Sequence, residues 1–311
     1  MRQVKWTGVY PAVTTKFTAN GDLDVPAFLK NIEYQVKAGI DGVVIGGSLG
    51  ESSTLTHSER LDLAKATVTA FGDTIDVILN IAEGSTRVAI DLVKKAETIS
   101  VHGLMVLPPM MYKPTDQEVA DYFKAIATST TLPIMLYNNP VDYKIEVTLE
   151  IFEQLKSLEN ICAVKESTRD VSNVTRMRNR FGDRFKILCG VDTLAMEELL
   201  MGADGWVAGL VDAFPAETVA IYRLIKVGRI EEARTIYRWF LPILELDINP
   251  QLVQNIKLAE VMTGIGTEHV RAPRHVLVGK ERERVIRILE KGIASRPNLP
   301  DYLSIDTNSI V

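Results

Sequence analysis

A short apolar run closes on charged and hydroxyl side chains at Ile161-Cys162-Ala163-Val164-Lys165-Glu166-Ser167. Its composition is typical of a strand that is covered on both faces. Amphipathic stretches with a period near 3.6 residues occur between runs of this kind, which predicts parallel βα units. Because side chains alternate along a strand, Lys165 shares one face with Ile161 and Ala163, and Glu166 points to the other face.

The same kind of run occurs eight times along the chain. The runs are Gly8–Val13, Gly42–Gly47, Asp76–Ala82, Gly103–Pro109, Pro133–Asn139, Ile161–Ser167, Phe185–Val191 and Gly205–Leu210. One of the intervening helical patterns begins with a capping box at Thr56-His57-Ser58-Glu59. No glycine fingerprint follows the first run, so the pattern favours a closed (β/α)8 TIM barrel over an open Rossmann sheet.

The alternation ends near residue 227, although the chain continues for more than 80 residues. We therefore predict a (β/α)8 barrel over residues 1–228 and a C-terminal helical extension with a tail over residues 229–311. The additional helices are expected at Ile230–Leu246, Leu252–Met262 and Glu281–Ala294. The segment Ser295–Val311 is expected to be loosely ordered.

Composition and charge exclude several classes of protein. Of the 311 residues, 46% are hydrophobic and 24% are charged, which is the balance of a globular protein with a large core. The net charge is −5 and no long run of like charge occurs, so a nucleic-acid partner is not expected. The N-terminus lacks the apolar core of a signal peptide, and no run of about 18 apolar residues is present. We expect a cytoplasmic protein that does not enter a membrane.

Metal chemistry is also not expected. The four histidines are widely separated in the sequence and none has the short spacing of a metal site. The two cysteines lie in separate apolar runs, which favours reduced core thiols over a disulfide.

The active site of such a barrel lies at the carboxyl ends of its strands. Lys165 ends one strand, and an ammonium group that loses hydration there has a lowered pKa and can attack a carbonyl as the free amine. The alternative is a buried ion pair with Glu51 or Glu166. Tyr137 ends another strand, where its phenol could either relay protons or pack as an aromatic side chain.

A glycine-rich turn, Gly46-Gly47-Ser48-Leu49-Gly50, follows the second run. Such a turn lets backbone N–H groups and the Ser48 hydroxyl approach an anion closely, as a carboxylate-binding loop requires. The same glycines could serve only to turn the chain.

Three ordered motifs resemble the dihydrodipicolinate synthase and N-acetylneuraminate lyase superfamily. They are Gly-Gly-Ser-Leu-Gly-Glu-Ser at 46–52, Tyr-Asn-Asn-Pro at 137–140 and Val-Lys-Glu-Ser at 164–167. The resemblance extends from Gly8 to about Ala294. It implies a class I lyase or aldolase that works without a metal or pyridoxal phosphate, usually as a homotetramer.

The resemblance also implies roles for individual residues. Lys165 forms a Schiff base with C2 of a 2-oxo acid such as pyruvate, and Tyr137 relays protons. Ser48 and the Leu49 backbone amide, in the turn that contains Gly47, bind the C1 carboxylate. Gly190 and Val207 match positions that line the pocket.

The departures from the family pattern bear on the substrate. The family's synthases have two adjacent threonines where this chain has Ser48 and Leu49. A tyrosine that they contribute across a dimer interface matches Met111, unless Tyr112 replaces it in the relay. An arginine that holds the second substrate's carboxylate matches Asp142, and like charges repel in a desolvated pocket. Activity as a 4-hydroxy-tetrahydrodipicolinate synthase is therefore disfavoured.

Segments around residues 107–112, 137–143 and 237–242 resemble the branch assigned to hydroxyproline breakdown. This resemblance implies a pyrroline-4-hydroxy-2-carboxylate deaminase, whose substrate is a cyclic imine 2-carboxylate with one negative charge. A sugar-acid (2-keto-3-deoxy) aldolase or dehydratase is the first alternative. The side chains available to bind either a polyol chain or a hydroxylated ring are Asn138, Asn139, Asp142 and Tyr143.

A barrel that binds 2-oxo acids without catalysis is an alternative of a different class, because a fold does not fix a function. Loss of the lysine or of the tyrosine would indicate it. Both Lys165 and Tyr137 are present.

Overall fold

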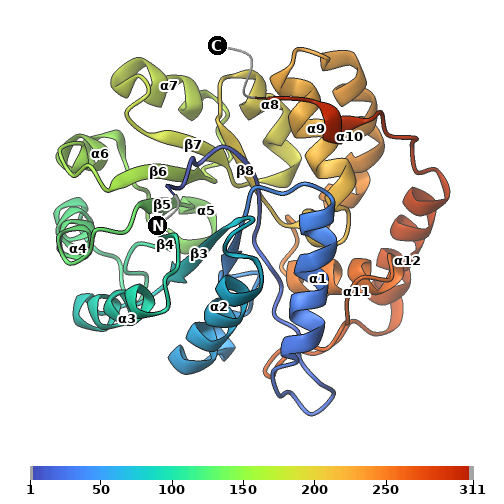
Figure 1. Cartoon of the computed structure of the whole chain (residues 1–311), viewed down its shortest axis with the longest axis horizontal. Helices are drawn as coiled ribbons and strands as arrows, with labels where there is room; N and C mark the ends of the chain where they lie inside the picture. Colours follow the sequence, from blue (N-terminus) through green and yellow to red (C-terminus); the bar gives the residue numbers. More distant parts are fainter. Residues whose placement is uncertain (1–2, 308–311) are drawn as a thin grey trace.

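Eight parallel strands form a barrel in the computed structural model, which describes residues 3–307 (Figure 1). The strands are β1 (Gly8–Pro11), β2 (Gly42–Ile45), β3 (Asp76–Ile81), β4 (Gly103–Val106), β5 (Ile134–Asn138), β6 (Ile161–Glu166), β7 (Lys186–Cys189) and β8 (Gly205–Ala208). They are ordered β1-β8-β7-β6-β5-β4-β3-β2. The last gap is bridged where Val13 N donates to Val44 O over 3.1 Å. The predicted (β/α)8 TIM barrel is confirmed.

Most strands are shorter than the apolar runs that predicted them. The first run extends to Val13, whereas β1 ends at Pro11. Val13 remains buried. Apolar character continues past the ends of the strands because the first residues of the following loops also pack inside the barrel.

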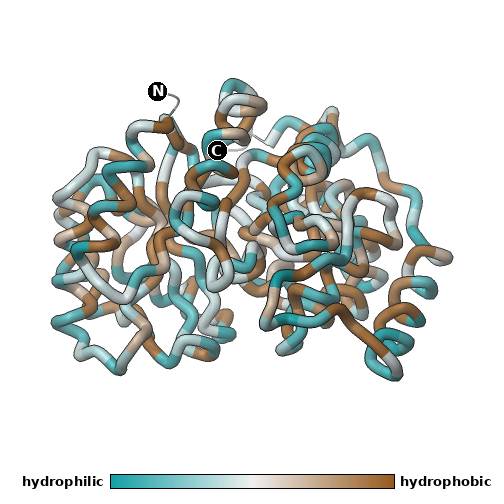
Figure 2. Tube along the Cα trace, turned by 90° about the horizontal axis from the view of Figure 1, so that it is seen from below, coloured by the Kyte–Doolittle hydropathy of each residue, from teal (hydrophilic) through white to brown (hydrophobic). Residues whose placement is uncertain are grey.

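Helices surround the barrel in the expected alternation (Figure 1). They are α1 (Val25–Lys37), α2 (His57–Phe71), α3 (Thr86–Thr98), α4 (Asp116–Thr128), α5 (Pro140–Tyr143), α6 (Leu149–Leu155), α7 (Ser172–Phe181), α8 (Ala195–Leu200) and α9 (Pro215–Lys226). The predicted capping box is confirmed, since Glu59 N donates to Thr56 Oγ1 and Thr56 N donates to the Glu59 carboxylate. Hydrophobic and hydrophilic segments alternate along the outer helices (Figure 2), as expected for helices with one buried face.

Three further helices follow the barrel, as predicted. They are α10 (Ile230–Leu244), α11 (Leu252–Met262) and α12 (Gly279–Ala294). Helix α10 packs against α9 and α12. At Gly292 a Cβ atom would lie 2.5 Å from Ile243 Cδ1, so α12 approaches α10 closely at this glycine. The extension lies on one side of the barrel, opposite α3 and α4 (Figure 1).

The segment after α12 is fixed to the barrel by arginine contacts. Arg223 Nη1 donates to the carbonyl oxygens of Tyr302 and Leu303 over 3.2 and 3.0 Å. Arg296 pairs with the Glu217 carboxylate of α9, with 2.9 Å between Nη2 and Oε2. The prediction of a loosely ordered tail is therefore wrong for residues 295–307. Residues 1–2 and 308–311, which form the ends of the two predicted units, lie outside the described residues.

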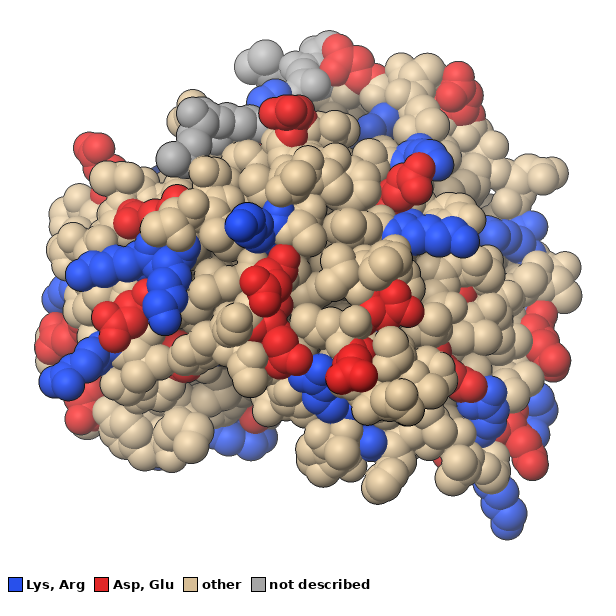
Figure 3. Space-filling view, turned by 60° about the horizontal axis from the view of Figure 1, so that its bottom comes forward, with Lys and Arg blue, Asp and Glu red and all other residues tan. Residues whose placement is uncertain are grey.

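Within residues 3–307, no helix has both the length and the apolar character needed to cross a lipid bilayer. Lysine and arginine side chains are interspersed with aspartate and glutamate side chains over the face shown in Figure 3.

Candidate active site

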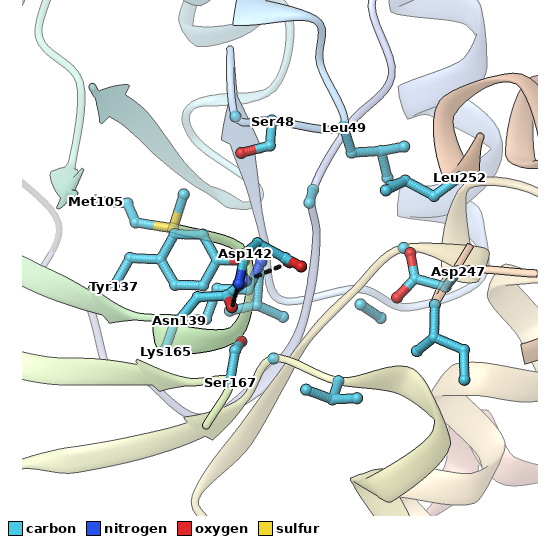
Figure 4. Close-up of a pocket in the computed structure, with 18 of the residues that line it drawn as sticks. Ser48, Leu49, Met105, Tyr137, Asn139, Asp142, Lys165, Ser167, Asp247 and Leu252 are labelled. Atoms are coloured by element: carbon cyan, nitrogen blue, oxygen red, sulfur yellow. Dashed lines mark hydrogen bonds between the residues drawn. The ribbon is translucent and has the colours of Figure 1, made fainter. Parts of the chain in front are cut away.

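A cavity opens at the carboxyl ends of the barrel strands and is closed on one side by the α10–α11 connection (Figure 4). All predicted site residues except Tyr112 and Asn138 line it. These are Gly47, Ser48, Leu49, Tyr137, Asn139, Asp142, Tyr143, Lys165, Gly190 and Val207. The structure thus brings together residues from loops and strands that are up to 160 positions apart in the sequence. The prediction for Asn138 is wrong, because its side chain is buried elsewhere and its Nδ2 donates to Val147 O over 3.2 Å.

Lys165 lies near the end of β6 and is 7% exposed. Its side chain faces the cavity, whereas the neighbouring Glu166 accepts a hydrogen bond from Asn173 Nδ2 of α7 over 2.7 Å. The predicted alternation is therefore confirmed. Burial lowers the pKa of Lys165, and the nearby carboxyl group of Asp247 acts in the opposite direction. A lowered pKa increases the fraction of free amine that can attack a carbonyl.

The structure excludes the ion pairs that were the alternative interpretation of Lys165. Within the described part of the chain, no hydrogen bond or ion pair holds its amine. Glu51 pairs instead with Lys257, with 2.6 Å between Oε1 and Nζ, and both side chains are fully buried. Lys165 is therefore not the buried structural partner of Glu51 or Glu166.

Gly190, after β7, makes room for the lysine. A Cβ atom at this position would lie 2.7 Å from Lys165 Cγ and 2.1 Å from Ser167 Oγ. Such contacts are too short for real Cβ atoms, so any other residue would push Lys165 out of its position. A glycine is required because the lysine side chain passes over the backbone here.

Tyr137 is positioned by strand register, because it pairs with Lys165 between β5 and β6. The Lys165 amine lies 4.4 Å from the centre of its ring. Asn139 Nδ2 donates to the Tyr137 hydroxyl over 3.1 Å and to Asp142 Oδ2 over 2.8 Å. The phenol oxygen therefore accepts from Asn139, and its own proton can point into the cavity. Burial raises the pKa of Tyr137 to about 12, so the phenol is protonated at neutral pH.

A second phenol in the cavity comes from the same chain. The Tyr143 hydroxyl is hydrogen-bonded to Ser48 Oγ. The Tyr143 ring meets the Tyr137 ring edge-to-face, with 5.7 Å between their centres. Burial raises the pKa of Tyr143 to about 12 as well. Two protonated phenols and one hydroxyl thus lie side by side near the lysine amine.

The glycine-rich turn presents unused donors to the cavity. The backbone N–H groups of Ser48 and Leu49 donate to no acceptor within residues 3–307. Gly46 has a φ of +68°, which lets the chain turn directly after β2. At Gly50 a Cβ atom would lie 2.8 Å from Val13 O, so the turn packs tightly on the segment after β1. This geometry suits the binding of a carboxylate.

Sequence reasoning missed two charged residues of the cavity. Asp247 lies in the α10–α11 connection, and Arg169 lies in the loop after β6. Arg169 Nη2 is 3.7 Å from Asp142 Oδ1, so the corner that contains Asp142 also holds a positive charge. Neither residue lies within a predicted strand. The location of Arg169 shortly after a predicted strand could have indicated it as a site residue. Nothing in the sequence indicated Asp247.

Met111 and Tyr112 do not reach the cavity of their own chain. Their side chains are 82% and 52% exposed, in the loop before α4. In the part of the chain that the structure describes, no group of three or more His, Cys, Asp or Glu side chains is arranged to hold a metal ion.

A buried lysine with a lowered pKa, beside a protonated phenol at the carboxyl end of a TIM barrel, defines an enzyme of the class I, Schiff-base-forming lyases. More particularly, the chain belongs to the dihydrodipicolinate synthetase family, whose model matches residues 5–292.

Individual relatives agree with this assignment. The chain is 30% identical to the 4-hydroxy-tetrahydrodipicolinate synthase of Moorella thermoacetica, over 93% of this chain and 99% of the relative. It is 32% identical to the synthase of Leptospira biflexa, over 86% and 90%. Among solved structures, dihydrodipicolinate synthase DapA-2 of Bacillus anthracis has a TM-score of 0.89 and 28% identity, and covers 95% of this chain and 100% of its own.

Proposed function

We propose that the protein is a pyrroline-4-hydroxy-2-carboxylate deaminase that uses Lys165 as the Schiff-base residue. The observation that carries the proposal is the polarity of the cavity beyond the lysine. Asp142 and Asp247 line this part, together with the hydroxyl of Tyr143. Carboxyl and hydroxyl groups suit a hydroxylated substrate with a single carboxylate better than a substrate with two carboxylates.

In the proposed reaction, the free amine of Lys165 attacks C2 of the cyclic imine, and the C2–N bond of the ring breaks. The ring nitrogen leaves C2 as an amine that stays attached to C5. The new protonated imine on Lys165 withdraws electrons from C3, which can then lose a proton. The resulting enamine expels the C4 hydroxyl group as water.

Hydrolysis completes the proposed reaction. Double-bond migration toward C5 converts the C5 amine to an imine, and water releases ammonia from C5 and the product from Lys165. One water is eliminated and two are consumed, so the net products are ammonia and a five-carbon 2-oxo acid with an aldehyde at C5.

The other residues have corresponding proposed roles. Ser48 and the Leu49 N–H group bind the C1 carboxylate, in the turn that contains Gly47. Tyr137 and Tyr143 relay protons during attack at C2 and during imine hydrolysis, and Asn139 orients Tyr137. Gly190 and Val207 shape the wall beside Lys165. The covalent imine is the electron sink, so the proposal needs no cofactor.

A 4-hydroxy-tetrahydrodipicolinate synthase is the second candidate. Arg169 lines the cavity and could attract a second carboxylate, although Asp142 already lies 3.7 Å from it. The curated relatives carry this name. A sugar-acid aldolase or dehydratase would use the same lysine and the same polar side chains.

Product analysis with three substrates tests the proposal. The purified protein is incubated with pyrroline-4-hydroxy-2-carboxylate, with pyruvate plus aspartate semialdehyde, or with a 2-keto-3-deoxy sugar acid. We expect release of ammonia and a dioxo acid from the first, with a kcat/KM at least 100-fold above that for the other two. Condensation of pyruvate with the semialdehyde at the higher efficiency would contradict the proposal in favour of the synthase.

We further propose that the chain assembles as a homotetramer. The exposed Met111 and Tyr112 lie near the mouth of the cavity, where Met111 and Tyr143 line a common groove. A second copy that covers these side chains would shield them from water.

A further inference from the structure

Asp247 reaches the cavity from outside the barrel. It follows α10, and its carboxyl group lies on the side of the cavity opposite Tyr137 and Lys165 (Figure 4). Gly209, after β8, makes this position accessible, because a Cβ atom there would lie 2.5 Å from Asp247 Oδ1. Gly209 N is itself held by Asp192 Oδ1 over 3.1 Å. The Asp247 carboxyl group therefore packs against the backbone of Gly209, where no side chain intervenes.

The Asp247 carboxyl group has no partner among the described residues. Within residues 3–307, neither a hydrogen bond nor an ion pair engages the Asp247 side chain. The neighbouring Asp192 is different, since it accepts hydrogen bonds from Leu210 N and from Trp206 Nε1 over 2.8 and 2.9 Å. Asp247 is only partly buried, and it lines the cavity. Of Asp192 and Asp247, only Asp247 has a carboxyl group that is available to a bound molecule.

The surroundings of Asp247 favour its neutral form. Burial raises its pKa well above the usual range, and the negative charges of Asp192 and Asp142 act in the same direction. The positive charges of Lys165 and Arg169 oppose this shift. A raised pKa favours the protonated form of Asp247, which is the form that can donate a proton inside the cavity.

We propose that Asp247 is a catalytic acid that protonates the departing C4 hydroxyl group of the substrate. This inference rests on the proposed function. Hydroxide is a poor leaving group, so the enamine can expel it only if a proton is supplied. As the C4–O bond breaks, the electron pair of the enamine forms the C3–C4 double bond and regenerates the protonated imine. The Asp247 proton moves to the leaving oxygen, and water departs.

The charges balance during this step. Asp247 becomes a carboxylate at the moment when the imine nitrogen of Lys165 regains its positive charge. Opposite charges attract more strongly in a partly enclosed cavity than in bulk water, so the new carboxylate stabilises the developing imine. A proton taken later from the incoming hydrolytic water would return Asp247 to its starting form.

The Asp247→Asn variant tests the inference, because an amide has nearly the same shape but cannot donate a proton as an acid. Glu245→Gln is the matched control, since it changes an exposed carboxylate two residues away. Each protein is incubated with pyrroline-4-hydroxy-2-carboxylate, and ammonia release is followed. Borohydride is then added, and the intact protein is weighed by mass spectrometry.

For Asp247→Asn we expect ammonia release to fall at least 100-fold, while Lys165 still forms an adduct that borohydride traps. This adduct should retain the C4 hydroxyl and be heavier by one water than the dehydrated adduct. The trapped adduct also shows that the variant is folded. Glu245→Gln should match the wild type in rate and in adduct mass.

A 4-chloro analogue of the substrate separates acid catalysis from a purely structural role. Chloride leaves without a proton, so Asp247→Asn should process this analogue within about threefold of the wild-type rate. If Asp247→Asn lost activity equally on both substrates, the inference would be overturned. It would also be overturned if the wild type released ammonia and Asp247→Asn released it from the hydroxy substrate at the same rate. A wild type that releases no ammonia would overturn the proposed function and this inference with it.

Discussion

The reactivity of Lys165 depends on close contacts around its side chain. The lysine passes over position 190, where a Cβ atom would lie 2.7 Å from its Cγ, and its amine lies 4.4 Å from the Tyr137 ring. Burial lowers the pKa of Lys165, whereas the nearby carboxyl groups of Asp247 and Asp192 act in the opposite direction. The reactivity of the amine therefore depends on shape and desolvation at this position.

The Gly190→Ala variant should lose activity without losing its fold. The added methyl group would displace Lys165 and Ser167, so kcat/KM should fall by at least 100-fold, since a displacement of about 1 Å can have this effect. Gly84→Ala is the control, because the Cβ there would meet only the exposed Met111 side chain. Steady-state kinetics and far-UV circular dichroism check both proteins. Near-wild-type kinetics for Gly190→Ala would show that the position of Lys165 does not depend on the absence of a side chain at residue 190.

Tyr143→Phe should slow proton transfer but leave carboxylate binding largely intact. The variant removes the hydroxyl that bonds to Ser48 and keeps the ring that packs on Tyr137. We expect kcat to fall about 10² to 10⁴-fold, the usual contribution of a proton-transfer group, and KM to change less than fivefold. A large rise in KM at constant kcat would instead assign Tyr143 to substrate binding.

Glu198 of α8 should make stability depend on pH. It is fully buried, and burial together with the charge of Glu166 raises its pKa from 4.5 to about 8. The folded state therefore retains a proton that the unfolded state releases above pH 4.5, so this contribution to stability is complete below that pH and is lost as the pH rises toward 8. Thermal unfolding of Glu198→Gln should show a Tm several degrees above wild type at pH 9 and a smaller difference at pH 5. Equal differences at both pH values would contradict this account.

At the scale of elements, a buried ion pair connects the glycine-rich turn at residues 46–50 to α11. Lys257 lies 2.6 Å from Glu51, and it also donates to His269 O over 2.6 Å. Glu51 has a φ of +56°, an uncommon conformation for a side chain of its size. The pair therefore holds the end of the turn that carries Ser48 and Leu49 in place.

The Lys257→Met variant should leave the buried Glu51 carboxylate without its closest cation, while Arg271 N still donates to Glu51 Oε2 over 3.1 Å. Removal of one member of a buried pair costs about 3–5 kcal/mol of unfolding free energy. Urea denaturation should show a loss of this size, and the KM for the 2-oxo acid should rise because the turn is released. The double variant Glu51→Gln with Lys257→Met should recover part of the stability. A loss below about 1 kcal/mol would show that the pair does not fix the turn.

The sequence predicted the strands, and therefore Lys165 and Tyr137, because both residues stand near the ends of nearly continuous apolar runs. It also predicted the capping box of α2. It could not predict that Asp247 reaches the cavity, since the path of the α10–α11 connection depends on how α10 packs against α9. Tyr112 was a candidate from its position beside Met111, whereas Tyr143 provides the second phenol in the cavity of this chain.

At the scale of the whole molecule, the extension and the barrel share one core. We proposed a division near residue 228 from the sequence pattern, and α9 and α10 do meet at this position. However, the extension supplies Asp247 to the cavity and Lys257 to the turn. It also supplies Glu260, which pairs with the buried Lys16 over 2.8 Å.

A fragment of residues 1–228 should therefore fail to fold as a stable unit. Two buried charges, Lys16 and Glu51, would lose their partners, and the apolar face of α9 would be exposed to water. Limited proteolysis and circular dichroism of the fragment check this expectation. A cooperative unfolding transition in the fragment would show that the barrel is an independent domain.

The central claim is that Lys165 forms a covalent imine with the substrate. Borohydride reduction after incubation with pyruvate or with pyrroline-4-hydroxy-2-carboxylate, followed by intact mass measurement and peptide mapping, tests this claim most directly. We predict one reduced adduct per chain, located on Lys165, and no adduct in Lys165→Ala. No adduct with either compound, or an adduct on another lysine, would contradict the account.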